Sequence, residues 1–198
     1  MNLALFDFDN TITFKDSFGP FLKFSLTTRQ QIIGTIKLAP WLLAYRTGYL
    51  NDQAIRQRLC AEAYRGYQIE LLEEIGKEYA QVILPTLIRA EALECILWHQ
   101  QRGDQVVVVS SSLDVYLNAW CQQQGIDLIC NQLEVRAGRY TGKLHQGDCG
   151  YAEKARRIKQ KYRLDDFDVI YAYGDSPNDL EMLKLAHKKY YQWEQVME

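Results

Sequence analysis

Three short apolar runs, each ending in polar residues, dominate the hydrophobic pattern of the chain. They are Leu3 to Phe8, Val106 to Val109 and Asp168 to Tyr173. Apolar runs of this length are typical of parallel strands that are buried on both faces of a sheet. Because a helical pattern follows each run, the alternation predicts an α/β fold with a Rossmann-like, doubly wound parallel sheet.

The interval between the first two runs is far too long for a single crossover helix. It contains helix-like segments at Phe18 to Leu26, Asp52 to Tyr64 and Ile69 to Leu84. We therefore expect an inserted α-helical cap domain at residues 14–84 and a catalytic core formed by residues 1–13 plus 85–198.

Two further elements are expected in the core. A helix from Pro85 to Arg102, with proline at its start and Gly103 just after its end, would return the chain to the sheet. The segment from Gln132 to Leu144 alternates around Ala137-Gly138 and predicts a small β-hairpin that follows a strand near Leu128.

The segment from Ile32 to Tyr45 is strongly apolar but contains Lys37 and Pro40. It is shorter than the roughly 20 residues that cross a bilayer. A packed helix pair is the first interpretation, and a surface that touches a membrane is the second.

Composition narrows the class of protein. The chain has 198 residues, of which 47% are hydrophobic and 24% charged, with a formal net charge of -2. These values are typical of a soluble globular protein, and the missing basic excess argues against a nucleic-acid partner. Five scattered cysteines without metal-ligand spacing, and an N-terminus that does not resemble a secretory signal, predict a cytoplasmic location.

Asp7 and Asp9 are the first candidates for chemistry. Because the two residues are two positions apart on an extended segment, their carboxylates are expected on one face at the open end of the strand. Such a pair is stabilised by a cation, and oxygen ligands favour Mg²⁺. Taken alone, the pair fits a solvated strand end equally well.

Other polar groups follow later apolar segments. Ser110 and the amides after it would hold a phosphate oxygen, although a serine triplet also fits a helix cap. Lys154 would offer a cation to the same anion, although by itself it fits a solvated surface. The loop from Gly174 to Asp179 supplies two more carboxylates, or alternatively a turn and a helix cap.

In this order, the sequences DFDNT, VVVVS, Lys154 and GDSPND resemble the four motifs of the haloacid dehalogenase superfamily of phosphatases. The resemblance is to subclass IB, which has a helical cap between the first two motifs and includes the phosphoserine phosphatases. It spans the chain from Asp7 to Asp179, and the second aspartate, Asp9, is similar to the phosphatase branch.

The resemblance implies a role for each motif residue. Asp7 would be the nucleophile and Asp9 the general acid and base. Mg²⁺ would be held by Asp7, the backbone carbonyl of Asp9, and Asp175. The phosphoryl group would be bound by Ser110, Ser111, Lys154 and Thr11. Asp179 and Asn178 would not touch it, and Asp179 would orient Lys154 or a metal-bound water. The implied activity is Mg²⁺-dependent hydrolysis of a small or amphiphilic phosphomonoester through a phosphoaspartate.

Substrate choice is expected in the cap. Asp16 lies where phosphoserine phosphatases carry a glutamate for the substrate's amino group, and Arg56 or Arg58 lies where they keep an arginine for its carboxylate. A shorter acid at Asp16 departs from that pattern.

A second resemblance is to the phosphatidylglycerophosphatases, and it is carried by the segment from Asp16 to Leu22, the apolar run near Pro40 and the segment from Cys149 to Lys154. It implies a lipid-headgroup phosphomonoester, with either weak association with the inner face of the membrane or an apolar substrate pocket. A phosphotransferase and a non-catalytic binding module are further alternatives, and the oligomeric state is left open.

Overall fold

A computed structural model describes residues 1–196. Seven strands form one sheet in the order β4-β3-β2-β1-β5-β6-β7. The central strands are parallel, whereas β4 and β7 pair in antiparallel fashion at the two edges. The strands are β1 (Leu3–Phe6), β2 (Gln105–Leu113), β3 (Asp127–Arg136), β4 (Arg139–His145), β5 (Ile170–Gly174), β6 (Lys188–Tyr191) and β7 (Glu194–Val196).

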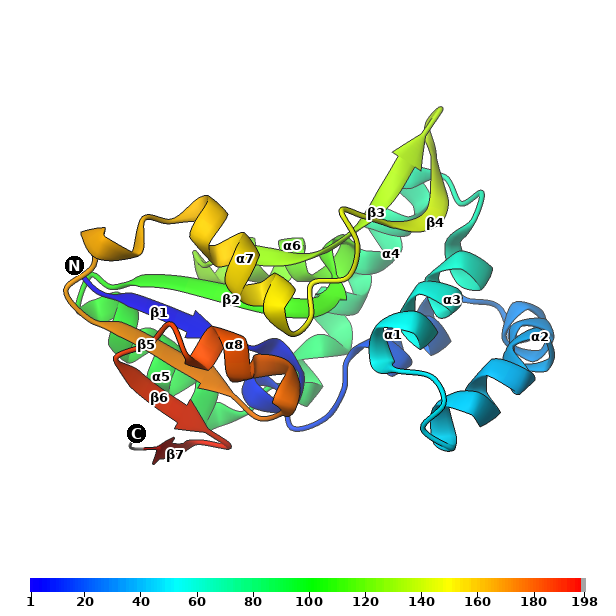
Figure 1. Ribbon diagram of the computed structural model, residues 1–198. Helices are drawn as coiled ribbons and strands as arrows, with labels where there is room; N and C mark the ends of the chain where they lie inside the picture. The colour runs from blue at the N-terminus through cyan, green and yellow to red at the C-terminus, as the bar shows by residue number, and fades with distance from the viewer. Residues whose placement is uncertain (197–198) are drawn as a thin grey trace.

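Helices cover both faces of this sheet (Figure 1). On one face lie α7 (Ala152–Lys161) and α8 (Leu180–Leu183); on the other lie α5 (Ala90–Gln101) and α6 (Asp114–Gln124). The alternating residues of β1 belong to two hydrophobic clusters, with Leu3 and Leu5 in one and Ala4 and Phe6 in the other. The predicted doubly wound α/β class is confirmed.

The strand predicted through Phe8 ends earlier, at Phe6. The amide of Asp7 still donates to the carbonyl of Tyr173, but residues Phe8–Ile12 form one wide, π-type turn in which Asp9 and Asn10 are not helical, and Asn10 has φ +63°. Thr13 stabilises the turn, because its hydroxyl accepts from the Asn10 amide at 3.1 Å. Asp7 and Asp9 therefore follow the strand rather than lying on it, but both side chains line one pocket at its open end, as expected.

Four helices form the cap side of the molecule: α1 (Phe18–Ser25), α2 (Thr28–Arg46), α3 (Asp52–Tyr64) and α4 (Ile69–Val82). The apolar segment around Pro40 is one continuous helix rather than the predicted packed pair. Among the residues of α2, only Leu38 is buried. The helix consequently lies at the end of the molecule and packs on α3 (Figure 1).

The helix predicted from Pro85 begins later. Pro85 lies in a short 3₁₀ helix, η2 (Leu84–Leu87), and α5 starts at Ala90. Between them the chain is extended, because it pairs with the other connection between cap and core: Thr13 bridges to Ile88, and the Arg89 amide donates to the Ile12 carbonyl. The two connections thus form a small antiparallel link.

Cap and core share a hydrophobic cluster. Phe21, Tyr64 and Tyr79 from the cap side pack with Tyr116 from α6. Helix α4 approaches α6 so closely that a Cβ at Gly76 would lie 1.9 Å from the Val115 carbonyl oxygen. Because α4 contacts both parts, the division at residues 14–84 stays a prediction.

The predicted hairpin is present as the ends of β3 and β4, joined by Ala137 and Gly138 with φ of +49° and +72°. It leans on the cap: a Cβ at Gly142 would lie 2.8 Å from the Cα of Ala61 in α3. The hairpin thereby supports the helix that carries Arg56.

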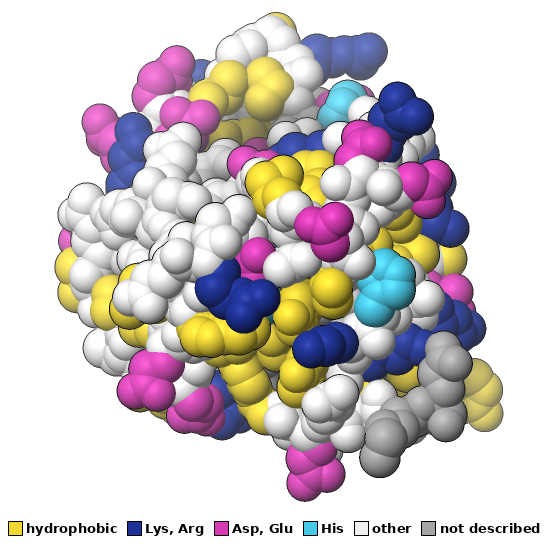
Figure 2. All heavy atoms as spheres, turned by 90° about the vertical axis from the view of Figure 1, so that its left-hand side faces the viewer, with side chains coloured by type: hydrophobic (Ala, Val, Ile, Leu, Met, Phe, Trp, Pro, Cys, Tyr) yellow, Lys and Arg dark blue, Asp and Glu magenta, His cyan; other side chains and the backbone are white. Residues whose placement is uncertain are grey.

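At the end opposite the cap, acidic and basic side chains are intermixed around hydrophobic ones (Figure 2). This face therefore presents no continuous basic surface among the described residues. Within residues 1–196, no helix has the length and apolar character needed to cross a membrane.

Candidate active site

The ammonium group of Lys154 joins the motif residues at the open end of the sheet. Its Nζ donates to Oδ1 of Asp7 at 2.5 Å and to Oδ1 of Asp179 at 2.6 Å. The Lys154 side chain is 1% exposed. Burial opposes its charged form, but the two carboxylates outweigh burial, and the pKa of Lys154 is raised. The lysine is therefore a fixed cation.

Three carboxylates gather beside this cation. One oxygen each from Asp7, Asp175 and Asp179 lies within 4.8 Å of the others. Burial and then Asp179 raise the pKa of Asp7 well above its ordinary value, and the same two causes raise the pKa of Asp175 to about 6. A single lysine thus leaves this acidic group short of positive charge. An all-oxygen cluster of this kind fits a hard divalent cation such as Mg²⁺.

Asp9 is held by hydroxyl and amide donors. Its Oδ1 accepts from the amide of Ser17 at 2.7 Å and from the Ser17 hydroxyl at 2.6 Å, and its Oδ2 accepts from the Ser112 hydroxyl at 2.5 Å. Ser17 directly precedes α1 and Ser112 is the last residue but one of β2, so two segments that are far apart in the sequence fix this carboxylate. Sequence reasoning did not find either serine, although Ser112 is the third member of the serine triplet.

The predicted phosphate-binding serines are both buried, but only one of them lines a pocket. Ser111 lines the pocket described below, and its hydroxyl donates to the Cys149 carbonyl at 2.8 Å. Ser110 is completely buried, and its hydroxyl accepts from the amide of Ser112 at 2.9 Å. Ser110 therefore supports the backbone near the end of β2, whereas Ser111 and Ser112 line the pocket.

Thr11 links the first motif to the last, because its hydroxyl donates to Oδ1 of Asp175 at 3.5 Å. It lies in the turn after the nucleophile candidate and is buried.

The last motif is a compact loop built around Asp179. Oδ2 of Asp179 accepts from the amides of Asp175 and Ser176, each at 3.1 Å, while its Oδ1 binds Lys154. A Cβ at position 174 would lie 2.5 Å from the Cβ of Asp179, which explains the glycine there. Asn178 accepts from the amide of Tyr151 at 2.5 Å and so anchors the start of the helix that carries Lys154.

On the cap side, Asp16 and Arg56 reach the same pocket. Asp16 accepts from the amide of Gly19 at 2.7 Å, and burial, followed by Asp9, raises its pKa. Arg56 donates to Oδ2 of Asp148 at 2.7 Å and thereby ties α3 to the core. Arg58 is not brought to this pocket, because its guanidinium lies over the Trp41 ring, 3.5 Å from the centroid.

Together these residues surround one cavity between cap and core, here called the active-site pocket, of about 440 Å³. Carboxylates and serines form its core side, whereas the cap side is partly apolar. Its lining residues are Asp7, Asp9, Asn10, Asp16, Phe18, Gly19, Leu22, Leu42, Tyr45, Asp52, Ile55, Arg56, Leu59, Ser111, Ser112, Asp175, Ser176 and Asn178. An apolar substrate pocket was one expectation, but Leu42, Leu59 and Asp52 were not singled out, because their distance from the motifs along the chain hides their proximity.

A nucleophile candidate, a buried cation and a carboxylate cluster at the ends of parallel strands agree with the expected family. The model of haloacid dehalogenase-like hydrolases matches residues 4–184. The chain belongs to this family. The predicted superfamily and the enzyme class, a hydrolase, are thereby confirmed, whereas subclass IB stays a prediction.

Relatives within the family have several names. Protein CicA of Caulobacter vibrioides is 32% identical over 196 residues, which cover 96% of this chain and 85% of CicA. A histidinol-phosphatase of Neisseria meningitidis is 29% identical, with 93% of this chain and 87% of the relative covered.

A solved structure described as a phospho-aspartyl intermediate analogue of phosphoserine phosphatase superposes with a TM-score of 0.65. The two sequences are 22% identical, and the superposition covers 96% of this chain and 85% of the phosphoserine phosphatase chain. At this identity the similarity supports the fold.

Proposed function

We propose that this protein is a Mg²⁺-dependent phosphatase that hydrolyses a small or amphiphilic phosphomonoester through a phosphoaspartate on Asp7. The observation that carries the proposal is the contact of buried Lys154 with Asp7 and Asp179, beside a third carboxylate on Asp175. An anionic nucleophile and an anionic phosphate repel each other, so fixed positive charge at their meeting point is what this reaction requires.

Support also comes from the relatives. Histidinol-phosphatase and phosphoserine phosphatase are named for the removal of a phosphoryl group from an alcohol, and this chain covers most of the length of both relatives described above.

In the first step, a carboxylate oxygen of Asp7 attacks phosphorus and the bond to the leaving alcohol breaks. Asp9 donates a proton to the departing oxygen and then, as a base, removes a proton from the water that hydrolyses the phosphoaspartate. Its hydrogen bonds to Ser17 and Ser112 hold the carboxylate in one position during both steps. Lys154 would bind the phosphoryl oxygens, and the hydroxyl of Ser111 would join it by turning its proton from the Cys149 carbonyl toward the pocket.

Asp7 and Asp175, with the backbone carbonyl of Asp9, would hold Mg²⁺. When bound, the ion supplies positive charge that offsets repulsion between the nucleophile and phosphate. Asp179 is committed to Lys154 and to the loop amides, so we assign it to orienting the lysine.

Hydrolysis of p-nitrophenyl phosphate tests the proposal. Activity is expected to require Mg²⁺, to stop with a chelator and to disappear in Asp7→Asn, whereas Asp165→Asn, on the exposed surface, serves as the matched control. Failure to hydrolyse any member of a broad phosphomonoester panel in the presence of Mg²⁺ would refute the proposed function.

A lipid-headgroup phosphomonoester is the second candidate, and the exposed side of α2 favours it. Ile32, Ile36 and Leu43 are 57%, 70% and 64% exposed. Such a helix face is suited to weak association with a membrane surface. Vesicle flotation with anionic lipid at low salt tests this candidate, and a protein that stays unbound would count against it.

A further inference from the structure

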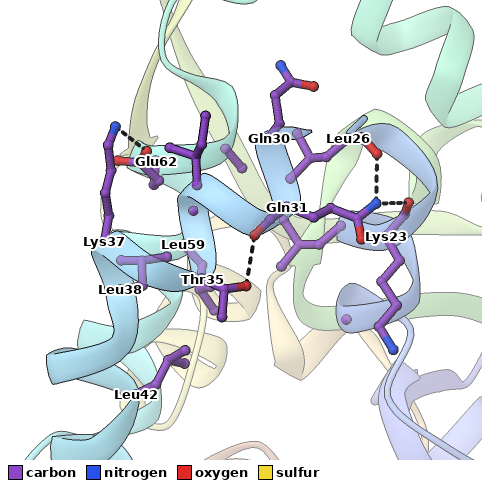
Figure 3. A pocket seen from close by; sticks show the side chains of 15 residues that line it. Lys23, Leu26, Gln30, Gln31, Thr35, Lys37, Leu38, Leu42, Leu59 and Glu62 are labelled. Atoms are coloured by element: carbon purple, nitrogen blue, oxygen red, sulfur yellow. Dashed lines mark hydrogen bonds and ion pairs between the residues drawn. The ribbon is translucent and has the colours of Figure 1, made fainter. Parts of the chain in front are cut away.

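The cap contains a second cavity, which we call the cap cavity (Figure 3). Its volume is about 440 Å³, and it lies among α1, α2 and α3. The side chains that line it are Leu22, Leu26, Ile33, Leu38, Leu42 and Leu59, with polar residues around them. Pockets of this size with mainly apolar walls are typical of small-molecule sites.

The cap cavity adjoins the active-site pocket. Gly19, Leu22, Leu42 and Leu59 line both cavities. The partition between them is therefore apolar and comes from three helices of the cap. A ligand whose phosphate lies at Asp7 would meet this apolar partition on the cap side of the pocket.

Polar groups around the cap cavity are occupied by one another. The side-chain amide of Gln31 donates to the carbonyls of Lys23 and Leu26, the Thr35 hydroxyl donates to the Gln31 carbonyl, and Lys37 pairs with Glu62 (Figure 3). Because these groups already have hydrogen-bond partners within the cap, a ligand in the cavity would make mainly apolar contacts.

Helix α2 forms one wall of the cavity and is held mainly at a few points. A capping box between Thr27 and Gln30 fixes its start, and Lys37 ties its middle to Glu62 on α3 at 2.6 Å. Only Leu38 of this helix is buried. The inward side of α2 thus faces space that its own side chains do not fill.

We propose that the cap cavity binds the apolar part of the substrate's leaving alcohol, so that the enzyme prefers amphiphilic phosphomonoesters with an unbranched alkyl segment. This inference rests on the proposed phosphatase activity. The phosphate is bound by Lys154 beside Asp7, and the alkyl segment passes between the shared side chains of Leu22, Leu42 and Leu59 into the space beneath α2. The surrounding leucines exclude water from this segment.

A series of n-alkyl phosphates from ethyl to octyl, kept below the concentrations at which they form micelles, tests the inference. With Mg²⁺ and the full chain, kcat/KM is expected to rise by about fourfold for each added methylene until the cavity is filled. A flat series, or one in which kcat/KM falls as the chain lengthens, would overturn the inference.

Filling the cavity provides a second test. Gly34 lines it, and a Cβ there would make only an ordinary contact, 3.7 Å from Cγ of Glu62. Gly34→Leu is expected to flatten the series while turnover of ethyl phosphate is retained. Ile36→Phe, at a 70% exposed position of the same helix, is the matched control and should keep the wild-type slope.

The outcomes separate the two proposals. If no phosphomonoester is hydrolysed, the proposed function fails. If ethyl phosphate is hydrolysed but chain length has no effect, only the cap-cavity inference fails. A slope that persists in Gly34→Leu and vanishes in Ile36→Phe would place the alkyl group on the exposed surface of α2 and would also overturn the inference. Thermal melting of each variant confirms that it is folded.

Discussion

Lys154 illustrates how much a single residue depends on its surroundings. In the sequence it is one basic residue in a helix that also contains Lys159 and Lys161. In the fold it is buried between Asp7 and Asp179, which come from opposite ends of the chain. Only the order of the four motifs distinguishes Lys154 from its neighbours in the sequence, because the contacts that bury it are all long-range.

Replacing Lys154 with Met is expected to abolish phosphatase activity and to lower the free energy of unfolding by about 3–5 kcal/mol without Mg²⁺, because two buried carboxylates lose their partner. Lys159→Met lies at an exposed position of the same helix. It should change neither the free energy of unfolding nor the activation free energy of hydrolysis by more than about 0.5 kcal/mol. Urea unfolding and p-nitrophenyl phosphate turnover measure both effects. Wild-type stability in Lys154→Met would contradict the assigned role.

At the same scale, the sequence predicts the motif carboxylates but not the groups that hold them. Ser17 and Ser112 bind Asp9 only because the chain turns after Phe6 and β2 continues through the serine triplet. Such hydroxyl contacts depend on backbone turns and on distant elements, and neither leaves a periodic pattern in the sequence. Conversely, Arg58 is of the residue type expected to bind a substrate carboxylate, but its guanidinium lies against the Trp41 ring.

Among the elements, those with clear patterns are predicted well. Helix α3 spans Asp52–Tyr64, as expected, and α1 differs by one residue at its end. Errors concentrate where tertiary contacts decide the conformation. Pro85 is a good first residue of a helix, but the antiparallel link between residues 12–14 and 87–89 delays α5. A packed helix pair was expected over the segment that contains Pro40, and α2 continues through it as one helix.

The packing of α4 on α6 gives a prediction at this scale. Gly76→Ala would place a Cβ 1.9 Å from the Val115 carbonyl oxygen and is expected to lower the free energy of unfolding by about 1–3 kcal/mol. Gly34→Ala on α2 would place a Cβ in ordinary contact, 3.7 Å from Cγ of Glu62, and should raise it by about 0.5–1 kcal/mol, because alanine favours the helix. Urea unfolding of both variants measures the difference. Equal changes in both would contradict the close approach of α4 to α6.

For the whole molecule, the sequence predicts a core with an inserted helical cap, and the structure adds the contacts between the segments assigned to each. The cap contributes Ser17 to the support of Asp9, while Arg56 of α3 reaches back to Asp148 in the core. The cap also provides the apolar walls on which substrate choice is proposed to depend. None of these links is visible in a linear pattern, because each joins segments that are distant in the sequence.

Direct detection of the covalent intermediate tests the central claim. In Asp9→Asn, p-nitrophenolate can leave without a proton, whereas the attacking water lacks its base, so the phosphoaspartate should accumulate. The variant would be mixed with p-nitrophenyl phosphate and Mg²⁺, quenched in acid and analysed by intact-protein and peptide mass spectrometry. We predict one phosphoryl group per chain, located on Asp7 and absent from Asp7→Asn. A phosphoryl group on another residue, or none while product is formed, would contradict the account.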